Sequence, residues 1–112
     1  LSLAVAWEIY IQEYENYLKL ERSLSENSVE AYVHDVVKLK QFLEISNREI
    51  SALQVAAVDL QQFIEYLNEL GMSAHSQARI ISGLKSFYKF MMYEGEMGSD
   101  PTALLVGNYP IR

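Results

Sequence analysis

The spacing of apolar residues constrains this chain more than any other feature, because they recur at steps of three and four almost from end to end. That spacing places the apolar side chains on one face of an α-helix. The chain has no sustained alternation of polar and apolar residues and no Asn-Gly or Asp-Gly pair that would mark a hairpin. The sequence therefore predicts an all-α fold.

The first two helices are expected in the first half of the chain. The first helix carries an apolar stripe that we interpret as core and not as a platform for stacked bases, since its spacing puts it on a single face. The stripe consists of Trp7, Tyr10, Ile11, Tyr14, Tyr17 and Leu18. The second helix is expected to follow an N-cap at Ser25 or Asn27, with Glu30 in a capping-box-like position, and to fade near Ile45.

Two more helices are expected in the second half. The third covers about Val58–Leu70, with Gly71 as its stop and with no good N-cap residue before it. The fourth begins after Ser73 and runs to about Tyr93. The expected core residues of the last three helices are Val29, Tyr32, Val33, Val36, Leu39, Phe42, Leu43, Leu60, Phe63, Ile64, Leu67, Ile80, Ile81, Leu84, Phe87, Tyr88 and Met91.

The connecting segments complete the expected fold. Residues 46–56 are predicted to form a loop or short turn, with Ile50 and Leu53 turned inward. Asp100-Pro101 predicts a short C-terminal helical turn, because Asp is a good N-cap and Pro suits the first helical position. We therefore expect one compact four-helix bundle over residues 1–105.

Composition restricts the classes of protein to which the chain can belong. Half of its 112 residues are hydrophobic, which is enough for one core. The absence of Cys excludes disulfides and thiolate metal sites and suits a cytoplasmic protein. No membrane span or signal-peptide pattern is present. The first residue is Leu1 rather than Met, which is compatible with a piece excised from a longer chain.

Charge is distributed unevenly. The net charge of −6 by itself argues against a nucleic-acid partner. Residues 73–93, however, carry Arg79, Lys85 and Lys89 and no Asp or Glu. On charge alone an ordinary solvated helix face explains this stretch, and a nucleic-acid contact is the alternative.

The sequence contains no recognisable catalytic or metal-binding constellation. His34 and His75 fall on different helices, without a convergent pair of carboxylates. There is no Gly-x-Ser-x-Gly elbow, and the five glycines are scattered rather than clustered into a phosphate-binding loop. We therefore predict no catalytic residue, cofactor or metal within this chain.

An ordered series of short motifs resembles the Xer-type and phage-integrase-type tyrosine recombinases. Residues 25–32 (SENSVEAY), followed by Asp35, are similar to the start of the second helix in that family, and residues 17–18 (YL) and 22–25 (RSLS) to the approach to it. The fourth helix of the family is matched by residues 73–76 (SAHS), Arg79, residues 82–85 (SGLK) and residues 87–90 (FYKF). Residues 68–71 and 100–102 fit the same template, so the resemblance extends from about Trp7 to Leu105.

The resemblance implies a SAM-like, orthogonal four-helix domain that forms one jaw of a clamp around double-stranded DNA. In this family the catalytic residues lie in a separate C-terminal domain, so residues 106–112 would begin the inter-domain linker. The implied partners are DNA, that catalytic domain and neighbouring protomers in a DNA-bound tetramer. The chain departs from the family pattern at Val33 and His34, where basic residues are frequent, and in residues 106–110, which lack a basic linker.

The predicted DNA contacts lie on the second and fourth helices. Serines and an asparagine at the two helix starts would meet phosphates, Arg79, Lys85 and Lys89 would neutralise them, and Arg79 could instead reach a guanine edge. We expect the three cations to lie beside the tip of the Ser25–Tyr32 helix, forming a concave surface that attracts anions. The predicted contacts are Ser25, Asn27, Ser28, His34, Ser73, His75, Ser76, Arg79, Ser82, Lys85 and Lys89.

Two alternatives stay open at this stage. So few cations predict weak and salt-sensitive DNA binding by this fragment. The alternative function is a free-standing helical protein-interaction module, which the acidic surface would suit equally well.

Gly83, in the middle of the fourth helix, serves either close packing or close approach to a DNA backbone. We favour packing because its neighbours Ile80 and Leu84 look buried.

Overall fold

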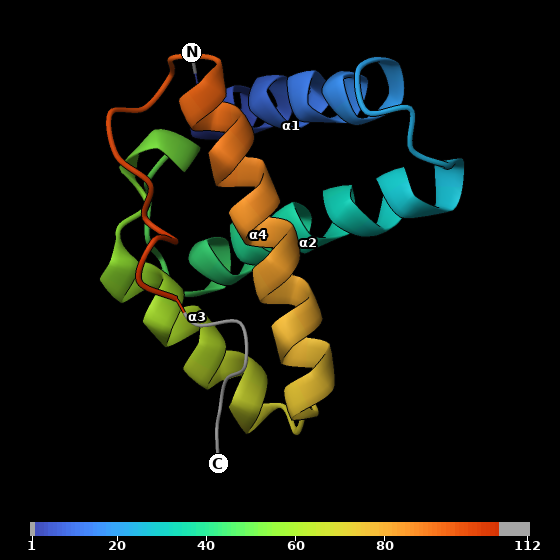
Figure 1. The fold of residues 1–112 in the computed structure, drawn as a ribbon. Helices are drawn as coiled ribbons and strands as arrows, with labels where there is room; N and C mark the ends of the chain where they lie inside the picture. Colours follow the sequence, from blue (N-terminus) through green and yellow to red (C-terminus); the bar gives the residue numbers. More distant parts are fainter. Residues whose placement is uncertain (1, 106–112) are drawn as a thin grey trace. The chain divides into compact units, whose positions relative to one another are not determined.

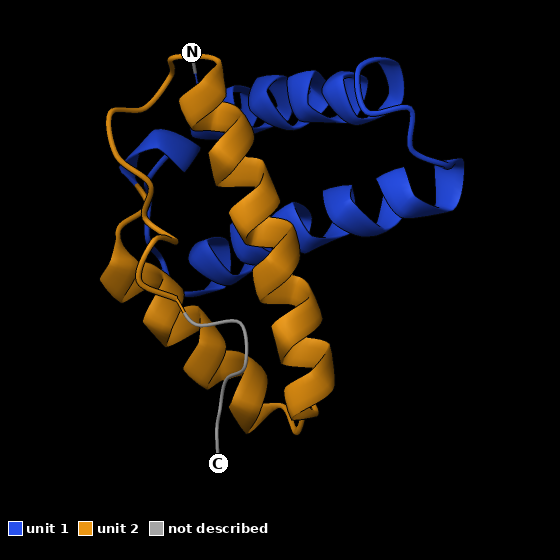
Figure 2. Ribbon diagram, in the orientation of Figure 1, with its two compact units in different colours: residues 1–54 blue, residues 55–112 orange. Residues whose placement is uncertain are grey.

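The computed structural model describes residues 2–105 and contains four α-helices and one 3₁₀ helix, with no strand in that range. The predicted all-α fold with four helices is therefore confirmed. The chain divides into two compact units, and the boundary between them along the sequence lies between Gln54 and Val55 (Figure 2). Each unit contains two of the α-helices, and the units are described separately below.

The first unit is a pair of contacting helices followed by a short 3₁₀ turn. It consists of α1 (Leu3–Leu20), α2 (Glu26–Ile45) and η1 (Ala52–Gln54), and Figure 1 shows α1 and α2 running in opposite directions. Of the predicted α1 stripe, Trp7, Tyr14 and Leu18 are buried and the other three residues are half-buried, so the core prediction is confirmed in part. Of the residues predicted for the core of α2, two are only half-buried, Tyr32 and Val33. The buried ones are Val29, Val36, Leu39, Phe42 and Leu43.

Each helix of the first unit is followed, two or three residues after its end, by a residue with left-handed backbone. Ser23 has a φ of 52° and Asn47 a φ of 58°. The Leu24 amide donates to the Leu18 carbonyl oxygen at 3.1 Å, and the Arg48 amide donates to that of Leu43 at 2.9 Å. These bonds reach back over the last helical turn and satisfy carbonyls that the helix leaves unpaired.

The segment after α2 is held to α1 by a tryptophan. The indole Nε1 of Trp7 donates to the Ile50 carbonyl oxygen at 3.1 Å. The prediction that Ile50 and Leu53 turn inward is confirmed only in part, because both side chains are half-buried. Ala52, in the 3₁₀ turn, and Val55 are the buried residues of this segment.

The second unit contains α3 (Ala57–Glu69) and α4 (Ala74–Tyr93), which are in contact with each other. All six apolar residues expected on the inner face of α4 are buried, and so are Leu60, Phe63 and Leu67 of α3. The rings of Phe87 and Tyr88 meet edge to face at 4.9 Å. Gly83 is also buried, which supports its role in packing.

A glycine follows α3, as predicted, and another follows α4, but the start of α3 does not depend on an N-cap side chain. Gly71 and Gly95 adopt φ values of 83° and 78° after the two helices. At the start of α3 the Ala56 amide donates to Asp59 Oδ2 at 2.8 Å, so a carboxylate inside the first turn compensates for the missing cap.

Beyond α4, residues 101–104 form hydrogen-bonded turns at the predicted place, without a helix. Asp100 Oδ1 accepts from the Thr102 amide at 2.8 Å and from the Thr102 hydroxyl at 2.6 Å. The carboxylate is thus engaged in a local turn rather than in a helix cap. The expected linker, residues 106–112, lies outside the described residues.

Candidate nucleic-acid interface

The helices α2 and α4 begin with the same serine motif in nearly the same geometry. Ser25 Oγ accepts from the Ser28 amide at 3.2 Å and donates to Ser28 Oγ at 3.1 Å. Ser73 Oγ accepts from the Ser76 amide at 3.1 Å and donates to Ser76 Oγ at 3.1 Å. Of the two N-caps predicted for α2, Ser25 is therefore correct and Asn27 is an exposed first-turn residue.

Each cap satisfies one amide of its helix start, and the other first-turn amides retain the partial positive charge of the helix dipole. Ser25, Ser73 and Ser76 are exposed, and Ser28 is half-buried. The first turn of α4 contains no acidic residue, whereas that of α2 contains Glu26. The start of α4 is therefore the more favourable of the two for an anion.

A polar stripe without carboxylates runs along α4. Its members follow one another at steps of four and three residues and thus lie on one side of the helix. His75, Ser82 and Lys89 are exposed, while Arg79 and Ser86 are half-buried. We call His75, Arg79, Ser82, Ser86 and Lys89 the α4 stripe.

Lys85 differs from the other cations of α4. It lies at the edge of the α4 stripe, four residues before Lys89, and is half-buried. Its Nζ donates to the Thr102 carbonyl oxygen at 2.9 Å, so the ammonium has a partner within the same unit. No local pattern in the sequence indicates this bond, because Thr102 is 17 residues away in the chain.

His34 lies in a more acidic setting than the α4 stripe. It is exposed and, with Asn27, lines a shallow groove of the first unit. Three carboxylates, those of Glu15, Glu26 and Glu30, line the same groove, and Lys19, also a lining residue, lies 2.9 Å from Glu15. Negative charge there weakens the attraction of His34 for a phosphate. The predicted arrangement of the α4 cations beside the tip of α2 joins the two units and stays a prediction.

Sequence analysis missed one buried residue that fixes the start of α4. Gln77 is 1% exposed, and its Nε2 donates to the Met72 carbonyl oxygen at 2.9 Å and to Asn68 Oδ1 at 3.3 Å. These bonds hold the turn from which Ser73 begins α4. A polar residue on the inner face of an otherwise apolar helix was the available signal.

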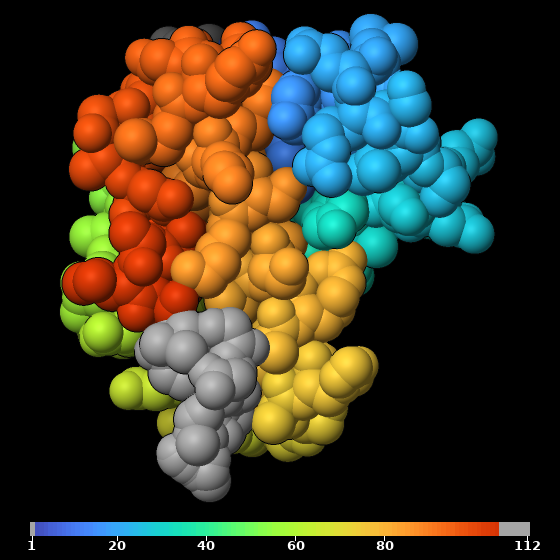
Figure 3. Space-filling view, in the orientation of Figure 1, coloured from blue at the N-terminus to red at the C-terminus, as the bar shows by residue number. Residues whose placement is uncertain are grey.

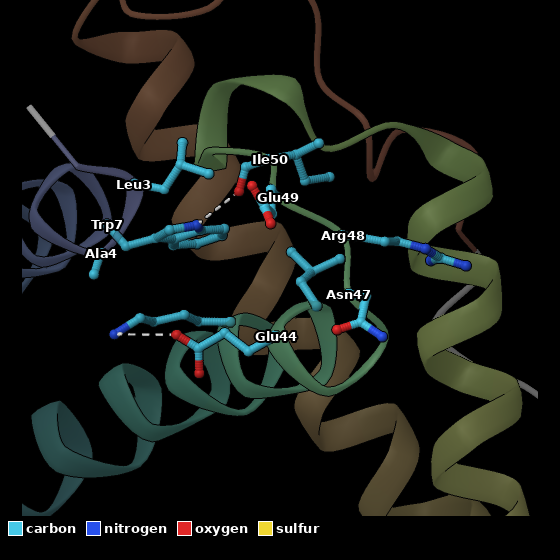
Figure 4. Close-up of a pocket in the computed structure, with 10 residues that line it drawn as sticks. Leu3, Ala4, Trp7, Glu44, Asn47, Arg48, Glu49 and Ile50 are labelled. Carbon is cyan, nitrogen blue, oxygen red and sulfur yellow. Dashed lines mark hydrogen bonds and ion pairs between the residues drawn. The ribbon is translucent and has the colours of Figure 1, made fainter.

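A hollow in the first unit is lined by apolar and charged residues of α1, α2 and the segment after α2 (Figure 4). Trp7 and Leu43 contribute apolar walls. Lys40 Nζ lies 4.0 Å from a carboxylate oxygen of Glu44, so the negative charge of Glu44 balances that of the lysine.

Among residues 2–105, the His, Asp and Glu side chains form no group of three that could hold a metal ion. None of the helices in that range is long and apolar enough to cross a membrane.

Comparison with known proteins agrees with the motifs. The profile of the phage integrase N-terminal SAM-like domain matches residues 11–95. The chain is 38% identical to the tyrosine recombinase XerD of Staphylococcus saprophyticus over 96 residues, and 32% identical to that of Agrobacterium fabrum over 95 residues. Each alignment covers 85% of this chain but only 32% and 28%, respectively, of the relative.

The chain therefore spans about a third of the length of these relatives. No match was found among solved structures. The family profile covers well over half of the chain, and its description agrees with the four helices seen here. The chain belongs to the family of phage integrase N-terminal SAM-like domains.

Proposed function

We propose that this chain is the sequence-specific DNA-binding half of a site-specific tyrosine recombinase, acting in DNA integration or recombination. It would clamp duplex DNA opposite a catalytic domain that is not contained in these residues. The relatives named as tyrosine recombinases are about three times as long, which leaves room for such a domain. The chain itself would then supply binding and no chemistry.

The observation that carries the proposal is the absence of carboxylates from α4. The chain as a whole has a net charge of −6, yet the 20 residues of α4 include Arg79, Lys85 and Lys89 and no Asp or Glu. A phosphate backbone attracts cations and is repelled by carboxylates. The acid-free outer side of α4 is therefore the surface of this acidic protein best suited to DNA.

The stripe and the serine caps would have different roles. Ser73 and Ser76 would offer hydroxyls and helix-start amides to phosphate oxygens, which positions the protein without specifying a sequence. Arg79 would neutralise a phosphate or contact a guanine edge in the major groove. With so few cations, binding by this fragment is expected to be weak, and a linked second domain would raise its effective concentration at the site.

The proposal can be tested by measuring duplex affinity against salt concentration. Arg79→Ala combined with Lys89→Ala is expected to weaken binding roughly tenfold at low salt and to reduce the salt slope by about 1.8, since each phosphate contact contributes about 0.9. The matched control is Lys19→Ala with Lys40→Ala, which removes the same charge from lysines that lie near Glu15 and near Glu8 and Glu44. Equal loss in both double variants would reject α4 as the DNA surface.

The second candidate is a protein-interaction module, which the acidic groove around His34 favours. Charge complementarity would then select a basic partner segment. Absence of duplex binding at low salt, together with retention of the fold, would favour this candidate. In the family, neighbouring protomers assemble on DNA, so the two roles can coexist in one protein.

A further inference from the structure

Lys85 connects α4 to the segment that follows it. Its Nζ donates to the Thr102 carbonyl oxygen at 2.9 Å, and Thr102 is 1% exposed. The same carbonyl oxygen accepts from the Leu105 amide at 3.0 Å. Figure 3 shows this segment lying against α4. The Thr102 carbonyl oxygen thus accepts one hydrogen bond from a side chain of α4 and one from the amide of the last described residue.

Asp100 completes the cluster. Its Oδ1 accepts from both the amide and the hydroxyl of Thr102, so the turn holds Thr102 through groups other than its carbonyl. Leu105 is 5% exposed, which anchors the end of the segment by burial as well. The bond from Lys85 is charge-assisted and therefore stronger than a bond between neutral groups. An apolar side chain of similar length would leave the buried carbonyl with one donor fewer.

We propose that Lys85 is a positioning residue, which fixes residues 100–105 on α4, and not a phosphate contact. The point from which the chain continues beyond Leu105 would thereby keep a fixed place relative to the α4 stripe. This inference removes Lys85 from the proposed DNA surface. The statement that Lys85 does not contact phosphate rests on the proposed function. Lys89, exposed and four residues away on the same helix, remains the phosphate contact.

The test compares Lys85→Met with Lys89→Met in the 112-residue chain by amide hydrogen exchange and by duplex binding against salt. For Lys85→Met we expect the Thr102 and Leu105 amides to exchange at least roughly tenfold faster, because their hydrogen bonds belong to the cluster. We also expect an unchanged salt slope. Lys89→Met should show the reverse, with unchanged exchange and a slope reduced by about 0.9. Lys85→Arg, which keeps a charged donor, should retain most of the protection.

A measurement on the unaltered chain covers the case in which Lys85→Met fails to fold. Reductive methylation should be slower at Lys85 than at Lys89, and added duplex should protect Lys89 without changing Lys85. Unchanged exchange in a folded Lys85→Met, or protection of Lys85 by duplex equal to that of Lys89, would overturn the inference. If Lys89 is neither protected nor needed for the salt slope, the proposed function fails, and the exchange result still decides the role of Lys85.

Discussion

At the scale of single residues, Gly71 is a position where the backbone conformation favours glycine. It ends the turn after α3 with a φ of 83°, and a Cβ added there would have no atom within 4 Å. The cost of Gly71→Ala is therefore conformational rather than steric crowding by neighbours. We expect a loss of about 1–2 kcal/mol in the free energy of unfolding, measured by chemical denaturation.

Gly98→Ala is the matched control for this substitution. Its Cβ would also meet nothing within 4 Å, but its φ lies outside the left-handed range. The control should be neutral or stabilise by up to about 1 kcal/mol, since alanine restricts the unfolded chain. If the two variants lose equal stability, the left-handed turn is not the reason for the glycine.

Tyr88 should make stability depend on alkaline pH. Burial holds the pKa of its hydroxyl well above the ordinary range, and the carboxylates of Asp100 and Asp59 raise it further. The folded state keeps the proton while the unfolded state releases it near pH 10. The contribution of Tyr88 is therefore full below about pH 10 and falls above it by ~1.4 kcal/mol per pH unit.

Chemical denaturation between pH 8 and pH 11 checks this expectation. Tyr88→Phe should show a shallower alkaline loss of stability than the unaltered chain. Tyr93→Phe removes a hydroxyl from a residue that is 72% exposed, and its pH profile should match that of the unaltered chain. Identical profiles for the two variants would show that Tyr88 does not keep its proton in the folded state.

Local signals were sufficient to predict the caps and stops that depend on neighbouring residues. Ser25 and Ser73 cap their helices, and Gly71 follows α3, because these interactions span four residues or fewer. The capping role of Asp59 is local too, but it was not predicted, because the usual capping residue precedes the helix and Asp59 is its third residue. The bond from Lys85 to Thr102 depends on how the chain folds back, which no local pattern encodes.

At the scale of elements, α4 combines an inner face that is apolar except for Gln77 with the acid-free stripe on the outside. We expect a single negative charge on this stripe to weaken duplex binding, because it would lie among the proposed phosphate contacts. Ser82→Glu tests this, since Ser82 is exposed and lies between Arg79 and Lys89 in the sequence. Affinity at low salt should fall roughly tenfold, with the helical circular dichroism unchanged.

Gln61→Glu is the control, because it adds the same charge at an exposed position of α3. Its affinity should remain close to that of the unaltered chain, apart from the small effect of one extra negative charge on the whole molecule. A fall equal to that of Ser82→Glu would mean that net charge, rather than the α4 stripe, governs binding.

Periodicity predicted the helices well because most of their buried side chains are apolar and fall at amphipathic spacing, although the polar residues Asp35 and Gln77 are buried too. The α1 stripe shows this, since Trp7, Tyr14 and Leu18 are buried as expected. The turn after Pro101 was less predictable. Asp100 bonds to Thr102 two residues on, and the same residues could equally have begun a helix.

At the scale of the whole molecule, the chain combines an acidic composition with one acid-free helix. A net charge of −6 opposes association with DNA, so any binding must come from local charge and from helix starts. The family profile identifies the domain but not its target, since phosphate contacts carry no sequence information. The sequence predicted the family and the acid-free segment, whereas the partner of Lys85 and the acidic groove at His34 required the structure.

The most direct test of the central claim is to map, residue by residue, which amide signals shift when duplex DNA is added to the 112-residue chain at low salt. We expect the largest shifts at the start of α4, near Ser73 and Ser76, and along the α4 stripe to Lys89, with smaller shifts at the start of α2. Shifts concentrated on α1 or α3, with the α4 stripe unaffected, would contradict it.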